Sequence, residues 1–390
     1  MNPKLWLAGK AALVGGSALA EKVRPPRATH RDQVPASADR LSPEWLTSAL
    51  CRDVPGAAVL RATRSGGSSG TSERVGLRIE YNEAGRAAGL PTDVFTKASA
   101  SFRQRMVLGG AGALHGETRF YTALRDKTSV EAPRGYWGCV DDRSWRSIVV
   151  IEDIVATKGA TFMQPTTGFD KAAMEDLVAN LARFHGPHWG NPELADLKTP
   201  AVYLRRATEL LDIRRRSEVG MERARSVMPP ALLGQANRLY DATLRAMNIA
   251  SDDMPRTLLH GDAHAGQTYR TADGAMGLAD WQAVLQGGWA FDFAYLVNSG
   301  LDPADRRAWQ NDLLRRYIDE LALHGGPTLS YDEALLAYRQ QSFWPYTAWA
   351  FTIGRAFYQP EMQPVPTCLA IVHRTATAID DLDAFAAVGL

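Results

Sequence analysis

Two aspartates near residue 270 have the neighbours and the spacing that acid–base or metal chemistry requires. Asp262 stands in the run His260–His264, and Asp280 follows eighteen residues later at the end of the apolar run 276–279. Both flank a Gly-containing loop between strand-like runs, so their side chains are placed to reach one crevice. A carboxylate in such a place can accept the proton of a hydroxyl group. Its hard oxygen atoms also suit Mg²⁺.

The same run permits a second chemistry. His260, Asp262 and His264 form an H-x-D-x-H cluster, in which two alternate residues could ligate zinc together. No second His/Asp cluster completes such a shell. A metallohydrolase is therefore the weaker hypothesis, and stoichiometric zinc in the purified protein would revive it.

The elements that must position the two aspartates fall into two kinds of pattern. Over roughly a hundred residues the order is strand, strand, strand, helix, strand, strand. The predicted strands are 57–63, 74–81, 93–98, 136–140 and 147–151, with a small-residue loop at 65–72 and a helical stretch to about residue 125. In 74–81 the apolar side chains alternate, which is typical of a strand with one buried face. From Asp170 onward the pattern is almost all helical, interrupted only at 258–280.

This order predicts an α+β protein of two lobes, a small β-rich lobe followed by a larger, mainly helical one. The crevice between two lobes is the default ligand site. The predicted segments are an N-terminal arm or helix at 1–40, the first lobe at 41–154 and the second lobe at 155–390.

Composition excludes several classes of partner. The chain has 390 residues, 45% hydrophobic and 22% charged, and 44 basic against 43 acidic residues give a formal net charge of +1. This balance suggests neither nucleic acid nor an anionic membrane as a partner. Three scattered cysteines imply no disulfide framework, so we expect a reducing, cytoplasmic location. The oligomeric state cannot be read from the sequence.

The first twenty residues are apolar and small, but Lys10 interrupts them and Gly15–Gly16 weakens a helix. The stretch is too short to span a bilayer. We expect a peripheral helix or loose arm and no stable membrane insertion, with secretion as the alternative.

The motif that carries most information is His260–Gln267 followed by Asp280-Trp281-Gln282. It resembles the signature of the aminoglycoside phosphotransferase and choline kinase superfamily, H-G-D-x-H-x-x-N with a later D-W or D-F. Within that superfamily, the residues of this motif are more similar to those of the ecdysteroid-kinase-like branch. The resemblance covers roughly residues 57 to 300 and implies a bilobal, protein-kinase-like fold with a small antiparallel sheet. Its implied reaction is the transfer of the γ-phosphate of ATP, with Mg²⁺, to a hydroxyl of a small molecule.

The resemblance also implies roles for the two lobes and for the matching residues. The lobe at 41–154 would bind the nucleotide, and the lobe at 155–390 would be catalytic and bind the substrate. Asp262 would be the catalytic base, and Asp280 would hold Mg²⁺. Lys97, in the third strand, would contact the α- and β-phosphates, with Glu117 holding it by an ion pair. Asp292 would be a buried carboxylate that ties loop backbone together. The other candidate nucleotide contacts lie in the small-residue loop and in the inter-lobe connection at 151–154, namely Ser68, Ser69, Gly70, Thr71, Ser72, Glu152 and Ile154. The backbone of 151–154 would form hydrogen bonds with the edge of the adenine.

Gln267 departs from the family pattern, which has Asn at this position as a metal ligand. Glutamine is longer by one methylene, roughly 1.5 Å. Three outcomes stay open: Gln267 reaches the metal, a water or Asp280 replaces it, or the protein is a pseudokinase that binds nucleotide with little turnover. Because the other four central residues are present, we expect activity to be retained.

The sequence also leaves open which small molecule accepts the phosphate. Aromatic residues after 343 could line a pocket for a flat or lipophilic alcohol or form a cage for a choline-like group. A polycationic aminoglycoside would need acidic side chains in the acceptor pocket. The candidate acids are Asp302, Asp305, Asp319 and Glu320.

Overall fold

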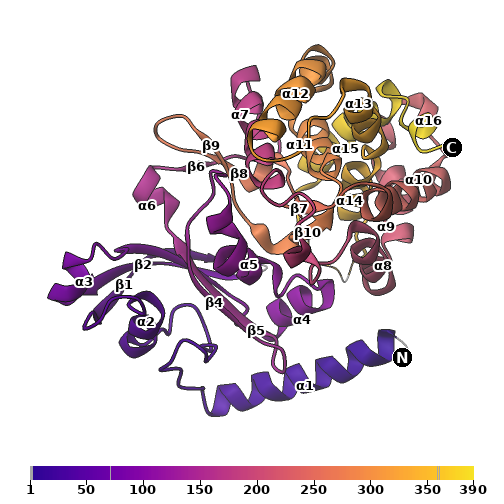
Figure 1. Ribbon diagram of the computed structural model, residues 1–390. Helices are drawn as coiled ribbons and strands as arrows, with labels where there is room; N and C mark the ends of the chain where they lie inside the picture. The colour runs from indigo at the N-terminus through magenta and orange to yellow at the C-terminus, as the bar shows by residue number, and fades with distance from the viewer. Residues whose placement is uncertain (1–2, 71, 358, 360) are drawn as a thin grey trace. The chain divides into compact units, whose positions relative to one another are not determined.

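A computed structural model describes residues 3–70, 72–357, 359 and 361–390. The chain forms two compact units (Figure 1). Unit 1 comprises Met1–Lys127 with Ala132–Ala160, and unit 2 comprises Thr128–Glu131 with Thr161–Leu390. The segments that the sequence predicted by function, 1–40, 41–154 and 155–390, stay a prediction.

Unit 1 is built on a five-stranded antiparallel sheet with the order β1-β2-β3-β5-β4. Its strands are β1 (Val59–Ser69), β2 (Glu73–Tyr81), β3 (Asp93–Ala98), β4 (Gly135–Asp141) and β5 (Arg146–Glu152). The alternation predicted for 74–81 is confirmed, because Val75, Leu77, Ile79 and Tyr81 are all buried. Their face packs on α2 (Pro43–Leu50), which begins where the hydroxyl of Ser42 accepts a hydrogen bond from the N–H of Trp45.

The first strand is longer than predicted. Residues 65–69 were expected in a loop, yet Ser68 pairs with Arg74 and Ser69 with Glu73 in a hairpin. Two register shifts interrupt this pairing. Small side chains weaken the sequence pattern of a strand but leave its backbone able to pair. The predicted loop at 65–72 therefore begins no earlier than residue 70.

The remaining helices of unit 1 are short apart from the first. They are α1 (Pro3–Val23), α3 (Glu83–Ala87), α4 (Phe102–Ala111), α5 (Gly116–Arg119) and α6 (Ile154–Lys158). A π-helical turn (Phe120–Leu124) and a 3₁₀ turn (Arg125–Lys127) follow α5. The helical stretch predicted to about residue 125 is thus interrupted, because Gly112 adopts a left-handed φ of 72° and ends α4.

Unit 2 is mainly helical. Its α-helices are α7 (Lys171–His185), α8 (Pro200–Leu211), α9 (Ile213–Arg223), α10 (Ala236–Asn248), α11 (Ala290–Gly300), α12 (Pro303–Leu323), α13 (Tyr331–Gln340), α14 (Phe343–Ile353), α15 (Val365–Asp381) and α16 (Ala384–Ala387). The apolar stripe predicted on α7 is buried, and α13 begins with the predicted capping box of Ser330 and Glu333. Figure 1 shows short strands beside α7.

Four of these short strands occupy the interruption predicted at 258–280 and extend it slightly: β7 (Thr257–Leu259), β8 (Thr268–Arg270), β9 (Met276–Leu278) and β10 (Leu285–Gly287). The fifth, β6 (Thr161–Phe162), precedes α7 and pairs with β8. The predicted α+β class, with an antiparallel sheet first and helices after it, is confirmed. Among the described residues, no helix combines the length and the apolarity that a membrane crossing demands.

Candidate functional site

Two strand pairs of unit 2 bring the predicted catalytic loop together. β7 pairs with β10, and β8 pairs with β9 so that Thr268 lies opposite Leu278. Asp262 lies between β7 and β8, and Asp280 follows β9. The N–H of Ala279 donates to the carbonyl of Gln267 at 2.8 Å, which places Asp280 directly beside the end of that loop. Three predicted residues, Asp262, Gln267 and Asp280, therefore share one small region.

Asp262 is held by a neighbouring amide. The Nε2 atom of Gln267 donates to Oδ2 of Asp262 at 3.1 Å. The side chain of Asp262 keeps 36% of its surface exposed, so its carboxylate is available to a ligand. Since the amide nitrogen faces Asp262, the amide oxygen of Gln267 is the atom that remains for a cation.

Asp280 adopts a backbone conformation that is uncommon for a residue with a side chain. Its φ and ψ are 60° and 63°, in the left-handed region. Such a conformation costs about 1–3 kcal/mol and is concentrated at functional sites. The bend turns the chain from β9 into the 3₁₀ turn Trp281–Ala283.

Asp292, at the start of α11, holds the backbone of the loop that carries Asp262. Its completely buried carboxylate accepts hydrogen bonds from the backbone N–H of His260 at 2.6 Å and from that of Gly261 at 2.9 Å. The prediction that Asp292 ties loop backbone is thus confirmed. Gly261 has a φ of +82°, and an added Cβ would lie 2.1 Å from the carbonyl oxygen of Ala283. Only glycine fits this position.

The histidines of the motif brace the loop. Nε2 of His260 lies 2.9 Å from the carbonyl oxygen of Ala279, to which it must donate, and Nδ1 accepts from the N–H of Asp262 at 3.3 Å. Nδ1 of His264 accepts from the N–H of Gly266. Burial lowers the pKa of His264, against the opposing charge of Asp262. With both ring nitrogens of His260 engaged, the geometry does not favour the H-x-D-x-H zinc hypothesis.

Two tyrosines that sequence reasoning missed lie close to Asp262. Burial, with a contribution from the negative charge of Asp262, raises the pKa of Tyr203 to about 12 and that of Tyr295 well above its usual value. Trp349 stacks edge-on against His264, with ring centroids 5.3 Å apart. An indirect signal exists for Tyr295: it stands three residues after Asp292 on α11, and residues at this spacing share a helix face.

The oxygen donors fit a hard divalent cation. The carboxylates of Asp262 and Asp280 and the amide oxygen of Gln267 are the ligand types that Mg²⁺ prefers. The hydrogen bond that turns the Gln267 nitrogen toward Asp262 supports this fit. Among the described residues, no group of three His, Cys, Asp or Glu side chains gathers as a metal site.

In unit 1 the predicted ion pair is present. Nζ of Lys97 lies 2.6 Å from Oε1 of Glu117, and each side chain is 8% exposed. Lys97 is on the central strand β3, between Arg74 of β2 and Val149 of β5, and Glu117 is on α5. A buried cation on a central strand is precisely fixed by its neighbours. Its contact with nucleotide phosphates stays a prediction.

The small-residue segment is tied to α4. The N–H of Gly70 donates to the carbonyl of Ser72 at 3.0 Å, and Nε2 of Gln104 donates to the carbonyl of Gly70. The hydroxyl of Ser72 is buried and has no hydrogen-bond partner among the described residues. Thr71 lies outside the described residues. Ser68 and Ser69 are strand residues rather than loop residues, so the prediction of a loop is corrected for these two positions.

The predicted adenine-contacting segment carries bonds of its own. The N–H of Glu152 donates to the carbonyl of Arg134, and the carboxylate of Glu152 accepts from Thr157 and from the N–H of Arg134. The carbonyl of Ile154 accepts from Ala160. These groups stabilise the end of β5 and the start of α6. Contact of Glu152 or Ile154 with a purine stays a prediction.

Comparisons with known proteins agree with the motif. A sequence model described as the phosphotransferase enzyme family matches residues 103–328. No curated protein matches the chain. Among solved structures, a choline kinase of Streptococcus pneumoniae is similar at 13% identity over 83% of this chain and 94% of its own, with a TM-score of 0.45. A macrolide 2′-phosphotransferase of Brachybacterium faecium is similar at 15% identity over 84% and 94%, with a TM-score of 0.38. These structural similarities are too low to support an argument about substrate.

Proposed function

Since this chain belongs to the phosphotransferase enzyme family, we propose that it transfers the γ-phosphate of ATP to a hydroxyl group of a small molecule. The observation that carries the proposal is the Asp262 carboxylate, exposed on one side, oriented by Gln267, and set on a loop whose backbone is fixed by Asp292.

Asp262 is the proposed catalytic base. Its carboxylate accepts the proton of the acceptor hydroxyl and aims the oxygen at the phosphate, which is the positioning that phosphoryl transfer needs. Gln267 restricts the rotation of that carboxylate through the bond to Oδ2. Mg²⁺, when bound by Asp280 and the amide oxygen of Gln267, would supply positive charge against the developing negative charge. Lys97, held by Glu117, would neutralise the α- and β-phosphates.

The surroundings of Asp262 favour a flat, weakly charged alcohol over an aminoglycoside. Three aromatic side chains lie near the Asp262–His264 loop: Tyr295 and Trp349 are buried, and Tyr203 is half-buried. Two of the acids predicted to attract a polycation are already paired: Asp302 with Arg374 at 2.8 Å, and Glu320 with Arg316 at 2.6 Å. The ecdysteroid-kinase-like resemblance is consistent with this choice, and that branch remains a proposal.

The test is a screen of purified protein with ATP, Mg²⁺ and a panel of flat and lipophilic alcohols, amino alcohols, macrolides and aminoglycosides, scored by the mass gain of one phosphate. We expect phosphorylation of at least one uncharged alcohol. Nucleotide binding without transfer to any member would instead support the pseudokinase alternative, in which Gln267 has removed turnover.

Asp262→Asn separates the catalytic role from folding. We expect transfer to fall by a factor of about 10²–10⁴ while nucleotide binding persists, because the amide cannot accept the proton. The matched control is Asp253→Asn, an exposed aspartate of the same unit. Undiminished transfer by Asp262→Asn would remove Asp262 from its proposed role.

A further inference from the structure

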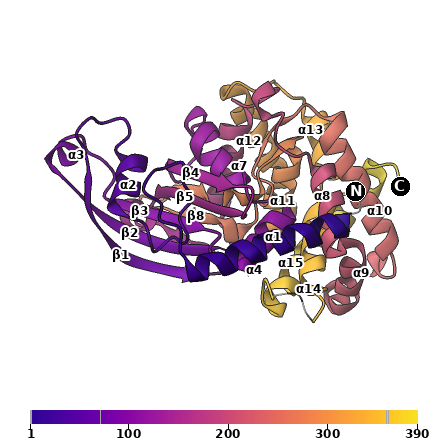
Figure 2. The ribbon, with the colours of Figure 1, turned by 90° about the horizontal axis from the view of Figure 1, so that it is seen from below.

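Helix α1 is attached to unit 1 through both apolar and polar side chains. Trp6, Leu7 and Val14 belong to a hydrophobic cluster with Trp145. The carboxylate of Glu21 pairs with the guanidinium of Arg105 at 2.5 Å, and Nζ of Lys10 donates to the carbonyl of Asp142 at 3.2 Å and lies over the ring of Trp145. Val14, fully buried, lies on the same side of the helix. Figures 1 and 2 both show α1 running alongside α4, with which it is in contact.

The opposite side of α1 is exposed and carries no charge. Its large side chains are Leu5, Leu13, Leu19 and Val23, which are 70%, 55%, 66% and 88% exposed. The other exposed residues on this side are Ala8, Gly9, Ala12, Gly16 and Ala20, and the exposed Lys22 lies about 40° outside it. At 100° per residue these nine positions span an arc of about 140°. An ordinary surface helix is apolar toward the protein and polar toward the solvent, whereas α1 is apolar on both sides.

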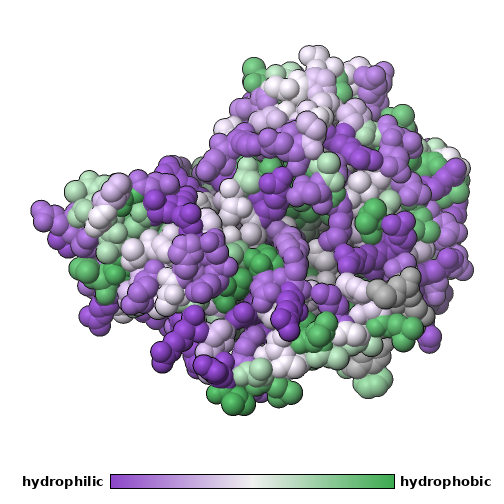
Figure 3. Space-filling view, turned by 60° about the horizontal axis from the view of Figure 1, so that its bottom comes forward, coloured by the Kyte–Doolittle hydropathy of each residue, from purple (hydrophilic) through white to green (hydrophobic). Residues whose placement is uncertain are grey.

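This exposed apolar side, which we call the outer face of α1, continues onto α4. Phe102 is 44% exposed, and its ring lies 3.6 Å from the position that a Cβ on Gly15 would take. Figure 3 shows several hydrophobic side chains along its lower edge, interspersed with hydrophilic ones. Exposed apolar side chains gathered on one side of a helix indicate a partner.

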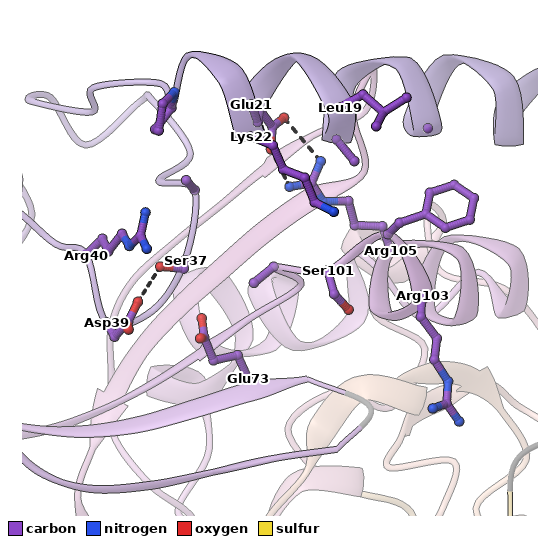
Figure 4. Close-up of a pocket in the computed structure, with 16 residues that line it drawn as sticks. Leu19, Glu21, Lys22, Ser37, Asp39, Arg40, Glu73, Ser101, Arg103 and Arg105 are labelled. Atoms are coloured by element: carbon purple, nitrogen blue, oxygen red, sulfur yellow. Dashed lines mark hydrogen bonds and ion pairs between the residues drawn. The ribbon is translucent and has the colours of Figure 1, made fainter.

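A cavity of about 970 Å³ opens between the C-terminal half of α1, the segment Ala36–Arg40 and the start of α4. Its acidic groups are engaged: Glu21 by Arg105, Glu73 by the N–H of Ala38 at 2.7 Å, and Asp39 by the hydroxyl of Ser37. Lys22 and Arg40 also line it and approach it from two sides (Figure 4). Within the part of the chain that the structure describes, neither is in an ion pair.

The basic residues continue past the helix. Lys22, Arg24 and Arg27 follow one another at the C-terminal end of α1, and all three are exposed. The net charge of +1 for the whole chain conceals this local excess. An apolar helix face with cations at one end matches the two layers of a bilayer surface, acyl chains below and phosphate groups above.

We propose that the outer face of α1 and the basic residues at its C-terminal end dock this protein on the surface of an anionic phospholipid bilayer. The helix lies parallel to the surface, with Leu13 and Leu19 among the acyl chains. Lys22 and Arg40 bind lipid phosphate at the cavity. Because Glu21 and Lys10 hold the helix from the other side, its apolar face is already formed before it meets the bilayer, which reduces the entropy lost on binding.

The experiment is flotation of the full chain with vesicles of phosphatidylcholine alone and of phosphatidylcholine mixed with phosphatidylserine. We expect binding to the anionic vesicles only, weakened by added salt. Leu13→Asp with Leu19→Asp is expected to weaken it by at least tenfold, because charge replaces apolar contact. Lys22→Gln and Arg40→Gln are each expected to weaken it about fivefold.

The matched control is Leu323→Asp, which replaces an equally exposed leucine at the end of α12. Control and variant should retain the melting temperature of the parent protein, since all the substituted side chains are exposed. Absence of binding to anionic vesicles, or equal loss in the control, overturns the proposal. So does a dimer in sedimentation velocity that Leu13→Asp dissociates, because a second copy of the chain would then cover the outer face.

Discussion

The side-chain amide of Gln267 donates to the carboxylate of Asp262 across 3.1 Å, within a single turn of the same loop. The 3₁₀ turn Ala265–Gln267 brings the two residues together, because the N–H of Gln267 also donates to the carbonyl of His264. The residue that departs from the family motif is therefore engaged with the proposed base. Its extra methylene is used in reaching that carboxylate.

Replacing Gln267 by Ala is expected to lower kcat about 100-fold, because a carboxylate that is free to rotate loses its alignment with the acceptor hydroxyl. Gln267→Asn retains the amide on a shorter side chain, and we expect an intermediate kcat. The kcat and KM of each variant should be measured at saturating Mg²⁺. A raised KM with an unchanged kcat would contradict the positioning role, since it would indicate loss of binding alone.

The Lys97–Glu117 pair offers a test in which stability and nucleotide binding change in different ways. Lys97→Met leaves the buried carboxylate of Glu117 without its cation, so we expect the free energy of unfolding to fall by about 3–5 kcal/mol. The double variant Lys97→Met with Glu117→Leu removes both charges and should recover most of that loss. Urea unfolding monitored by fluorescence gives the three free energies.

The affinity for ATP should not recover together with the stability. If Lys97 contacts phosphates, the double variant regains stability but still binds ATP weakly in a calorimetric titration. Parent-like affinity in the double variant would show that the pair serves the fold of unit 1 only.

Local patterns were enough to predict several features. The alternation of apolar residues predicted the buried face of β2, because every second residue of a strand lies on the same face. Helical spacing likewise fixed the buried side of α7. Lys97 and Glu117 were paired on the resemblance, and the contact is present.

Features that depend on residues far apart in the sequence were not predicted. Ser68 and Ser69 gave no strand pattern, since their pairing with β2 uses backbone groups that every residue has. Tyr203 approaches Asp262 from a helix some sixty residues earlier, and no sequence period reports such a contact. The Gln267–Asp262 bond depends on a turn geometry that a five-residue spacing does not specify.

The carboxylate of Asp292 is expected to be more sensitive to substitution than its distance from the chemistry suggests. In Asp292→Asn one acceptor oxygen becomes an N–H₂ group, which faces a backbone N–H of His260 or Gly261 inside a fully buried site. We expect a loss of about 1–3 kcal/mol in the free energy of unfolding, because one buried donor is left unsatisfied.

The same change should lower kcat, since the loop that carries Asp262 loses an anchor. Asp253→Asn, at an exposed position, is the control for both measurements. Unchanged stability in Asp292→Asn would mean that the N–H groups of His260 and Gly261 find other acceptors.

The burial of His185 lets us predict how the free energy of unfolding depends on pH. It is fully buried, with Nδ1 2.7 Å from the hydroxyl of Tyr317 and Nε2 3.3 Å from Asp292. Burial lowers its pKa below the ordinary value of 6.5, although Asp292 acts in the opposite direction. Because the unfolded chain then binds the proton more tightly, the contribution of His185 is fully present above pH 6.5 and is lost as the pH falls below it.

His185→Gln cannot take up this proton, so its free energy of unfolding should fall less steeply below pH 6.5 than that of the parent protein. The difference in slope is at most about 1.4 kcal/mol per pH unit for one proton. Urea unfolding at several pH values on either side of 6.5 gives both slopes. His264 is buried with a lowered pKa as well, so some slope should survive in the variant. Identical slopes would mean that His185 is already protonated in the folded protein, held in that form by Asp292.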